Sequence, residues 1–335
     1  MTQVRFPRRL DRRRGDRRAA RGRRGPAPAA TRAAVRRAPL AAVVVGGGPA
    51  GLSAALVLGR ARRRVLVLDT GRPANAVVEQ VGGLLGHTEV GPAELRESGR
   101  RQLAEHETVD VRVDEVLGAR RTPEGLAVRT ADGGVLRTQT LLLAHGLRYD
   151  PPPLPGIGPM WGRSVFHCPF CDGWEVRDRR LAVHGNGRAA ARSALVVARW
   201  SDDVVLCTDG PARLNGERAV LRRAGVRIRE EPIRALDGPD GRLERIVFDN
   251  GGQEACDALF VSTRRSQPND LAAAIGCHLT AEDTIVTDPA GRTGVPGVYA
   301  AGDAATPALR SVANALGSGS RAAHAIALDL VPELA

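Results

Sequence analysis

The sequence predicts an α/β fold built from two nucleotide-binding β-α-β units. Two observations carry this prediction: a glycine-rich turn follows a short apolar run near residue 46, and a second such turn follows another near residue 185. A third observation is a Cys-x-x-Cys pair lying between the two turns. Short Val- and Leu-rich runs are typical of buried parallel strands, and a glycine turn that opens a helix is typical of dinucleotide binding.

The first unit comprises an expected strand at 40–45, a turn at 46–51, a helix to about residue 59 and a strand at 65–69. Gly46 allows the tight turn, Gly48 lets the backbone approach a pyrophosphate, and Gly51 lets helix and strand touch. Ala50 lies inside this Gly-x-Gly-x-x-Gly turn, and Asp69 follows Gly51 by 18 residues (69 − 51). An acid at about this distance is typical of a carboxylate that binds a ribose hydroxyl.

The second unit has an expected strand at 181–184, a turn at 185–190, an Ala-rich helix to about residue 200 and a strand at 204–207. Its Gly-x-Gly-x-x-Ala turn contains Gly185, Gly187 and Ala190, and Asp209 ends its second strand. The offset from Gly185 to Asp209 is 24 (209 − 185), against 23 (69 − 46) in the first unit. The matching spacing predicts an internal duplication.

The remaining expected elements are strands at 141–144, 259–261 and 297–301, and a final helix over about 311–330. A proline-rich stretch at 151–155 reads as a linker between domains. Gly302 and Asp303 end the last strand.

Cys168 and Cys171 are the candidate redox centre, because two cysteines two residues apart can close a small disulfide ring. Asp172 follows the pair, and His167 precedes it and can lower the pKa of Cys168 or accept a thiol proton. Two structural thiols are the alternative. Zinc is disfavoured, because the chain has no second Cys-x-x-Cys or His pair at ligand spacing, so we expect no metal.

The charge of +12 comes from the first 38 residues, where 14 Arg stand against two Asp (14 − 2 = +12). We expect residues 1–38 to form a disordered Arg-rich extension that binds no specific nucleic acid, because it has no groove-reading motif. No segment has the roughly 18 uncharged apolar residues of a membrane span. Five scattered cysteines favour a reducing cytoplasm.

Three motifs in order resemble those of the low-molecular-weight thioredoxin reductase family of flavin-dependent pyridine nucleotide–disulfide oxidoreductases. They are the turn at 46–51, Cys-Pro-Phe-Cys-Asp-Gly at 168–173 and Thr-Gly-Val-Pro-Gly-Val-Tyr-Ala-Ala-Gly-Asp at 293–303. The resemblance implies two Rossmann-like domains, with the pyridine nucleotide domain inserted into the FAD domain. It implies an FAD-binding domain made of 39–155 and 286–335, an NAD(P)-binding domain at 156–285, and a homodimer.

The resemblance also implies roles for single residues. Gly48 and Gly51 would face the FAD pyrophosphate, and Asp303 would bind a ribityl hydroxyl. Cys171 would lie next to the flavin, and Cys168 would exchange with substrate. The family's proton shuttle would be Asp172, its adenosine ribose ligand would be Asp69, and the final helix would point its amino end at the flavin ring.

The resemblance therefore predicts a reductase that passes electrons from NAD(P)H through FAD and the cysteine pair to a thioredoxin-like protein or a small disulfide. The family commonly has His-Arg-Arg where this chain has Thr-Asp-Gly at 208–210, and an acid at Asp209 favours NADH over NADPH. A rival prediction is an oxidase of small dithiols that uses oxygen. A third, from another class, is a redox sensor that binds nucleic acid through its Arg-rich extension.

Overall fold

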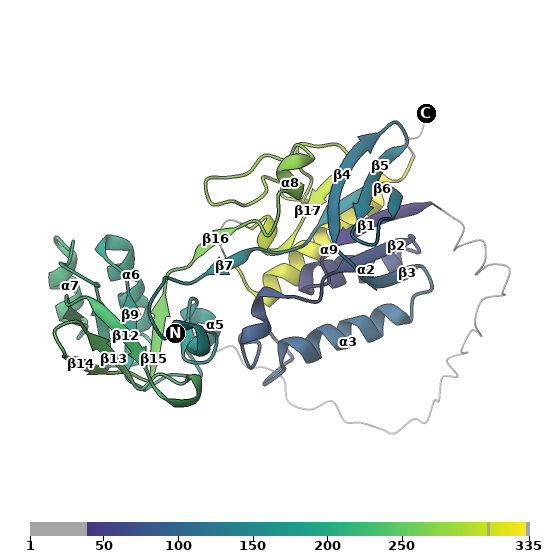
Figure 1. Ribbon diagram of the computed structural model, residues 1–335. Coiled ribbons are helices and arrows are strands. Elements are labelled where there is room, and N and C mark those ends of the chain that lie inside the picture. The colour runs from purple at the N-terminus through teal and green to yellow at the C-terminus, as the bar shows by residue number, and fades with distance from the viewer. Residues whose placement is uncertain (1–38, 307–308, 333–335) are drawn as a thin grey trace, which may run out of the picture.

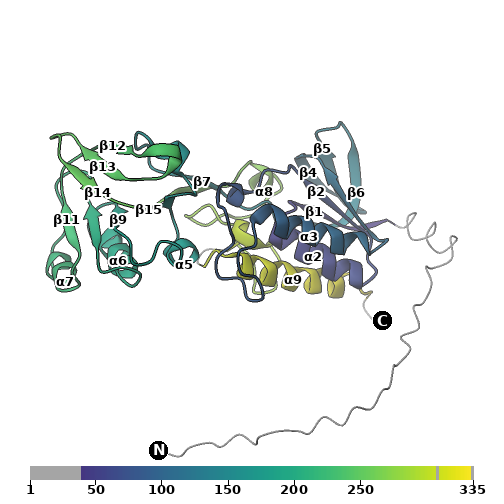
Figure 2. The ribbon, with the colours of Figure 1, turned by 90° about the horizontal axis from the view of Figure 1, so that it is seen from below.

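The computed structural model describes residues 39–306 and 309–332, so the predicted extension at 1–38 lies outside the described residues. The described chain forms two α/β domains joined by a narrow two-stranded ribbon (Figures 1 and 2). Each domain has a parallel sheet as its centre. The predicted fold class, two Rossmann-like domains in an α/β chain, is confirmed.

The first domain contains a seven-stranded sheet in the order β3-β2-β1-β6-β5-β4, with β17 also paired to β6. Strands β1, β2, β3, β6 and β17 are parallel, whereas β5 pairs antiparallel with both β4 and β6. The strands are β1 (Leu40–Val45), β2 (Val65–Asp69), β3 (Val109–Val113), β4 (Val116–Thr122), β5 (Gly125–Thr130), β6 (Val135–Leu143) and β17 (Val298–Ala300).

Helices α2 (Pro49–Arg60) and α9 (Val312–Asp329) pack against each other beside this sheet, although they lie at opposite ends of the chain (Figure 2). Small buried residues such as Ala54 and Ala322 let them approach, and a Cβ at Gly319 would collide with the backbone of Ala50. Helix α3 (Pro92–Ala104) lies next to α2. This packing fixes the amino ends of α2 and α9 at one edge of the sheet.

The second domain contains a parallel sheet in the order β11-β10-β9-β15-β8. Side chains of β9 alternate between its two faces: Ala182 packs with the antiparallel sheet β12-β13-β14, and Leu181 and Val183 pack with helices α6 and α7. The elements are β8 (Val165–Phe166), β9 (Leu181–His184), α6 (Gly187–Val197), β10 (Val204–Cys207), α7 (Glu217–Arg223), β11 (Arg227–Arg229), β12 (Ile233–Asp237), β13 (Arg245–Phe248), β14 (Gln253–Ala255) and β15 (Ala258–Val261).

The connecting ribbon pairs β7 (Arg148–Asp150) with β16 (Arg264–Ser266). Short helical segments complete the described chain: η1 (Ala74–Val77), α4 (Ile157–Met160), α5 (Pro169–Asp172), η2 (Pro239–Gly241), α8 (Leu271–Ala274) and η3 (Gly302–Ala304). In the described ranges, no helix combines the length and apolar character that crossing a bilayer requires.

The packing of α8 bears on where the chain returns to the first domain. Leu271 and Ala272 of α8, together with Ile285, belong to the core around the seven-stranded sheet. The family resemblance implied that these residues belong to the inserted domain at 156–285. Because they are buried against the first domain, we propose that the chain returns to it at β16.

Candidate functional site

A cavity of about 600 Å³ opens at the carboxyl edge of the seven-stranded sheet. The turn after β1, the end of β2 and the segment after β6 line it, together with the amino end of α9. The second domain contributes the residues around the cysteine pair. The cavity therefore joins the first glycine turn to the candidate redox centre.

The first glycine turn leaves the amino end of α2 open to this cavity. Gly48 is the N-cap residue, and within the described part of the chain no side chain caps the helix there. A Cβ at Gly48 would meet no described atom within 4 Å, whereas a Cβ at Gly51 would overlap the carbonyl oxygen of Gly46. An open helix amino end with glycine in front fits a pyrophosphate, because its N–H groups can donate to phosphate oxygens.

Asp69 lies at the end of β2, where the sequence predicted a ribose ligand, and its carboxylate is already paired. Its Oδ2 accepts a hydrogen bond from Arg100 Nη2 at 2.6 Å and lies 3.6 Å from Arg96 Nη2. Its Oδ1 accepts from the N–H of Gly71 at 3.2 Å. Sequence reasoning missed the two arginines, which come from α3, because only tertiary packing brings them to the turn.

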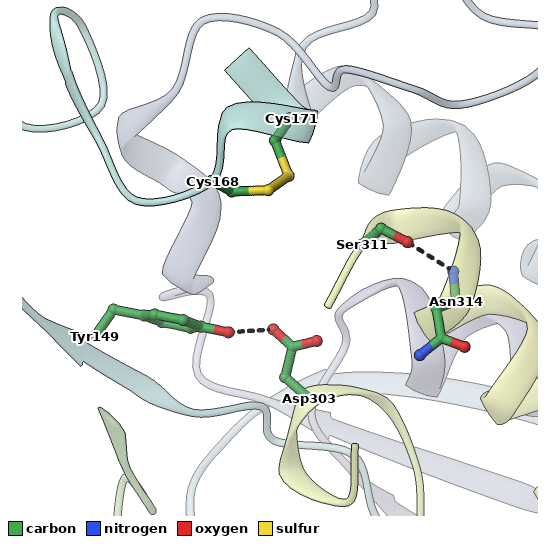
Figure 3. The surroundings of a disulfide bond; sticks show 6 residues. All are labelled: Tyr149, Cys168, Cys171, Asp303, Ser311 and Asn314. Atoms are coloured by element: carbon green, nitrogen blue, oxygen red, sulfur yellow. Dashed lines mark hydrogen bonds between the residues drawn. A yellow bond between two sulfur atoms is a disulfide. The ribbon is translucent and has the colours of Figure 1, made fainter. Parts of the chain in front are cut away.

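Cys168 and Cys171 form a disulfide at the start of α5 (Figure 3). Figure 3 shows the disulfide on one side of the site, with Tyr149, Asp303 and Ser311 across from it. Cys171 lines the cavity. A Cβ at Gly82 would overlap the carbonyl oxygen of Cys171, so the first domain packs directly on α5.

Asp172 is poised to exchange a proton near neutral pH. Burial, and then the charge of Glu175, raise its pKa from 3.8 to about 7. Glu175 Oε1 accepts a hydrogen bond from Gln80 Nε2 of the first domain at 2.9 Å. The interaction crosses between domains, and no sequence motif indicated Gln80.

His167 packs its ring against Tyr149, with 4.9 Å between ring centroids, and against Trp161 at 5.9 Å. Burial, followed by the charges of Arg265 and Arg310, lowers its pKa to about 4. The imidazole is therefore neutral at physiological pH. In that state it can accept a proton but supplies no positive charge to stabilise a thiolate.

Asp303 is held in the cavity by a residue that the sequence did not single out. Tyr149 Oη donates to Asp303 Oδ2 at 2.7 Å (Figure 3). Burial raises the pKa of Asp303. Gly302 takes a φ of +70° and its N–H donates to Ser318 Oγ, which ties this turn to α9.

Two further groups at the cavity suit a bound cofactor. Ser311 caps α9 by accepting a hydrogen bond from the N–H of Asn314 at 3.1 Å (Figure 3). His145 is half-buried, the desolvation of its ring lowers its pKa, and its Nδ1 lies 3.1 Å from the carbonyl oxygen of Gly146. Its Nε2 has no hydrogen-bond partner among the described residues. A buried acceptor without a donor predicts that a ligand hydroxyl or N–H reaches it.

The second glycine turn lies apart from this cavity, in the second domain. Gly185 follows β9, and Ala190 of α6 packs close to it. Gly187 begins α6 behind the N-cap residue Asn186. Asp209 Oδ1 accepts from the N–H of Ile233 at 2.7 Å. Within residues 39–306 and 309–332, no group of three or more His, Cys, Asp or Glu gathers as a metal site.

Comparisons with known proteins agree with this arrangement. A family model described as pyridine nucleotide-disulphide oxidoreductase matches residues 40–319. Thioredoxin reductase tcpT of Claviceps purpurea is 28% identical over 305 residues, covering 88% of this chain and 95% of that protein. The crystal structure of HlmI is 37% identical with a TM-score of 0.82, and the match covers 88% of this chain and 93% of HlmI. The structure of an oxidoreductase from Agrobacterium tumefaciens is 31% identical with a TM-score of 0.82, and the match covers 88% of this chain and 100% of that protein.

Proposed function

Because the chain belongs to the pyridine nucleotide-disulphide oxidoreductase family, we propose that it is an FAD-dependent disulfide reductase of thioredoxin reductase type. The observation that carries this proposal is the disulfide between Cys168 and Cys171, which faces a cavity that begins at a dinucleotide-binding turn. The enzyme passes electrons from a pyridine nucleotide through FAD to this disulfide and on to a substrate disulfide.

The cavity suits FAD. The open amino end of α2 at Gly48 would hold the pyrophosphate, Asp69 the adenosine ribose, and Asp303 a ribityl hydroxyl. Ser311 begins the helix whose amino end would face the flavin ring, where negative charge would be stabilised. When bound, FAD supplies the two-electron chemistry that connects a nicotinamide to a disulfide.

The two cysteines have different proposed roles. We propose that Cys171, which lines the cavity, receives the electron pair, and that Cys168 attacks the substrate disulfide as a thiolate. Reduction of the Cys168–Cys171 disulfide consumes two electrons and two protons and leaves two thiols. Asp172 carries one of these protons, because its pKa of about 7 keeps it protonated in mildly acidic and neutral solution.

For the electron donor we propose NADH rather than NADPH. Support comes from Asp209, whose negative charge at the end of β10 would oppose a 2′-phosphate and suit a ribose diol. Gly185, Gly187 and Ala190 would form the turn that holds this nucleotide.

For the substrate we propose a thioredoxin-like protein, with small disulfides as alternatives. Phe170 lies between the two cysteines with 70% of its surface exposed, and Trp174 follows with 64% exposed. Such exposed aromatic side chains beside a redox pair favour contact with a protein surface. A homodimer in a reducing cytoplasm completes the proposal. The three free, buried cysteines support the reducing compartment (Cys207, Cys256 and Cys277).

An anaerobic mixing experiment tests this function. NADH should bleach the flavin of the holoenzyme faster than NADPH, and a thioredoxin-like disulfide should restore the colour. Asp209→Arg should narrow or reverse the preference. Cys168→Ser and Cys171→Ser should both abolish reduction of the substrate disulfide but leave bleaching by NADH intact. If a small dithiol bleaches the flavin, oxygen restores it and neither nucleotide acts, the reductase proposal is wrong and a dithiol oxidase replaces it.

A further inference from the structure

The two glycine turns differ at the residue that begins each helix. The N-cap residue of α2 is Gly48, with no side-chain cap within the described part of the chain and with open space in front of it. The N-cap residue of α6 is Asn186, whose Oδ1 accepts from the N–H of Gly187 at 2.8 Å. The residue after the N-cap is Pro49 in α2, which has no N–H, and Gly187 in α6. The second turn therefore satisfies an N–H group of its own helix with a side chain, whereas the first turn places no capping side chain in front of its helix.

Asn186 also ties the second turn to the segment that follows β10. Its Oδ1 accepts from the N–H of Arg213 at 2.8 Å. Its Nδ2 donates to the carbonyl oxygens of Thr208 and Pro211, both at 3.0 Å. A single side chain thus makes four hydrogen bonds to backbone on both sides of the gap between the turn and the end of the second strand.

That gap is where a dinucleotide binds in a Rossmann-like unit. The pyrophosphate lies on the glycine turn, and the adenosine ribose lies between this turn and the end of the second strand. The carbonyl oxygen of Arg213 lies 3.9 Å from the Cβ position of Gly187, so backbone of the 208–213 segment faces the turn directly. A nucleotide that enters must displace the Asn186 side chain or move this segment.

We propose that Asn186 is a clasp that closes the pyridine nucleotide site by holding segment 208–213 on the second glycine turn. The clasp lowers the affinity for nucleotides, because binding must first exchange its hydrogen bonds. This inference rests on the proposed function, in which a pyridine nucleotide is the electron donor. It makes Asn186 a residue that sets nucleotide affinity rather than a catalytic residue.

Titration of the full-length holoenzyme with NAD⁺ and NADP⁺ by calorimetry tests the clasp, because the oxidised nucleotides bind without reducing the flavin. Asn186→Gly should lower both dissociation constants by about tenfold, the effect of one to two hydrogen bonds of ordinary net strength. Asn186→Ala should act in the same direction. The backbone of Asn186 has φ −131° and ψ 159°, which alanine adopts without strain, so this variant remains usable if glycine loosens the fold.

Asn250→Gly is the matched control. Asn250 accepts a hydrogen bond from the N–H of Gly252 at 2.8 Å in the turn between β13 and β14, in the same domain. This variant removes an equivalent side-chain bond away from the second turn and should leave both dissociation constants unchanged. Unchanged or weaker nucleotide binding in both Asn186 variants would overturn the clasp.

Amide hydrogen exchange gives a second readout that does not depend on nucleotide. The N–H of Arg213 should exchange faster in Asn186→Ala than in the wild-type holoenzyme, and slow exchange in the variant would also overturn the clasp. A different result would contradict the proposed function alone. If Asn186→Gly binds NAD⁺ more tightly than the wild type but NADH does not bleach its flavin, the clasp is supported and the reductase proposal is wrong.

Discussion

Asp172 and His167 flank the redox disulfide, and burial shifts their pKa values toward the neutral form of each. The pKa of Asp172 rises to about 7 and that of His167 falls to about 4. Between these values both side chains are uncharged. The disulfide therefore lies between two neutral groups, one of which can donate a proton and one of which can accept it.

Turnover should depend on the protonation of Asp172. We expect kcat for the substrate disulfide to fall as pH rises through about 7, because Asp172 then loses the proton that it donates. Asp172→Asn should lower kcat by about 100-fold or more and remove this pH dependence, while leaving FAD content unchanged. Stopped-flow measurement of disulfide reduction from pH 5 to 9 checks this. An unchanged profile in Asp172→Asn would assign the proton to another group.

Stability gives an independent check on the same pKa values. The folded protein binds the Asp172 proton more tightly than the unfolded chain, so this residue lowers the free energy of unfolding as pH rises from 3.8 to about 7. His167 has the opposite effect: it lowers the free energy of unfolding as pH falls from 6.5 to about 4. In Asp172→Asn the loss of stability between pH 3.8 and about 7 should be smaller than in the wild type, as measured by urea midpoints across this pH range.

At the residue scale, the sequence indicates features whose constraint is local. The glycine turns and the cysteine pair are contiguous motifs, whereas Tyr149 reaches Asp303 across 154 positions and Gln80 reaches Glu175 across 95. A single sequence carries no mark of such pairs. Their partners are defined only once the sheets are assembled.

At the scale of elements, the two β-α-β units were predictable because apolar runs, glycine turns and Ala-rich helices follow one another in a fixed order. Strands β4 and β5 were not predicted, because exposed arginines interrupt their apolar runs. The ribbon strand β7 was also missed. It has only three residues and directly precedes the proline-rich stretch that reads as a linker.

Element packing predicts different outcomes for two glycines of the first turn. Gly48 has an ordinary φ of −77° and open space around its Cβ position, so Gly48→Val should fold but fail to retain FAD, because the side chain enters the pyrophosphate path. In Gly51→Val the side chain would collide with the carbonyl oxygen of Gly46, and overpacking of this kind costs about 1–3 kcal/mol or more.

Circular dichroism, thermal melting and the flavin absorbance of the purified variants separate these outcomes. Gly48→Val should keep wild-type secondary structure and be colourless, whereas Gly51→Val should melt earlier. A yellow Gly48→Val protein with one FAD per chain would show that the pyrophosphate does not bind at this turn.

At the scale of the whole molecule, the active site exists only where the two domains meet. The first domain supplies the cavity and Asp303, and the second supplies the disulfide through α5. The resemblance to a known family implied this insertion, but the apolar pattern did not, because the pattern at 297–301 predicts a strand without indicating that it pairs with β6 of the first sheet. The contact between domains is close at Gly82, whose Cβ position overlaps the carbonyl oxygen of Cys171.

Gly82→Val should therefore move α5 away from the cavity without disturbing either domain. FAD content and the rate at which NADH bleaches the flavin should stay near wild type, because both glycine turns are unchanged. The rate of electron transfer from the flavin to the Cys168–Cys171 disulfide should fall at least about tenfold, since a displacement of about 1 Å can cost a reaction 100-fold. Rapid-scan spectroscopy separates the two phases.

Gly91→Ala is the control for this prediction, because it lies in the same segment and its Cβ would only touch the carbonyl oxygen of Glu79 at 3.4 Å. It should behave as wild type in both phases. The two variants differ in whether the disulfide is displaced. If Gly82→Val transfers electrons as fast as Gly91→Ala, the contact between Gly82 and Cys171 does not hold the disulfide in place. The ribbon of β7 and β16 must then set the distance between the domains.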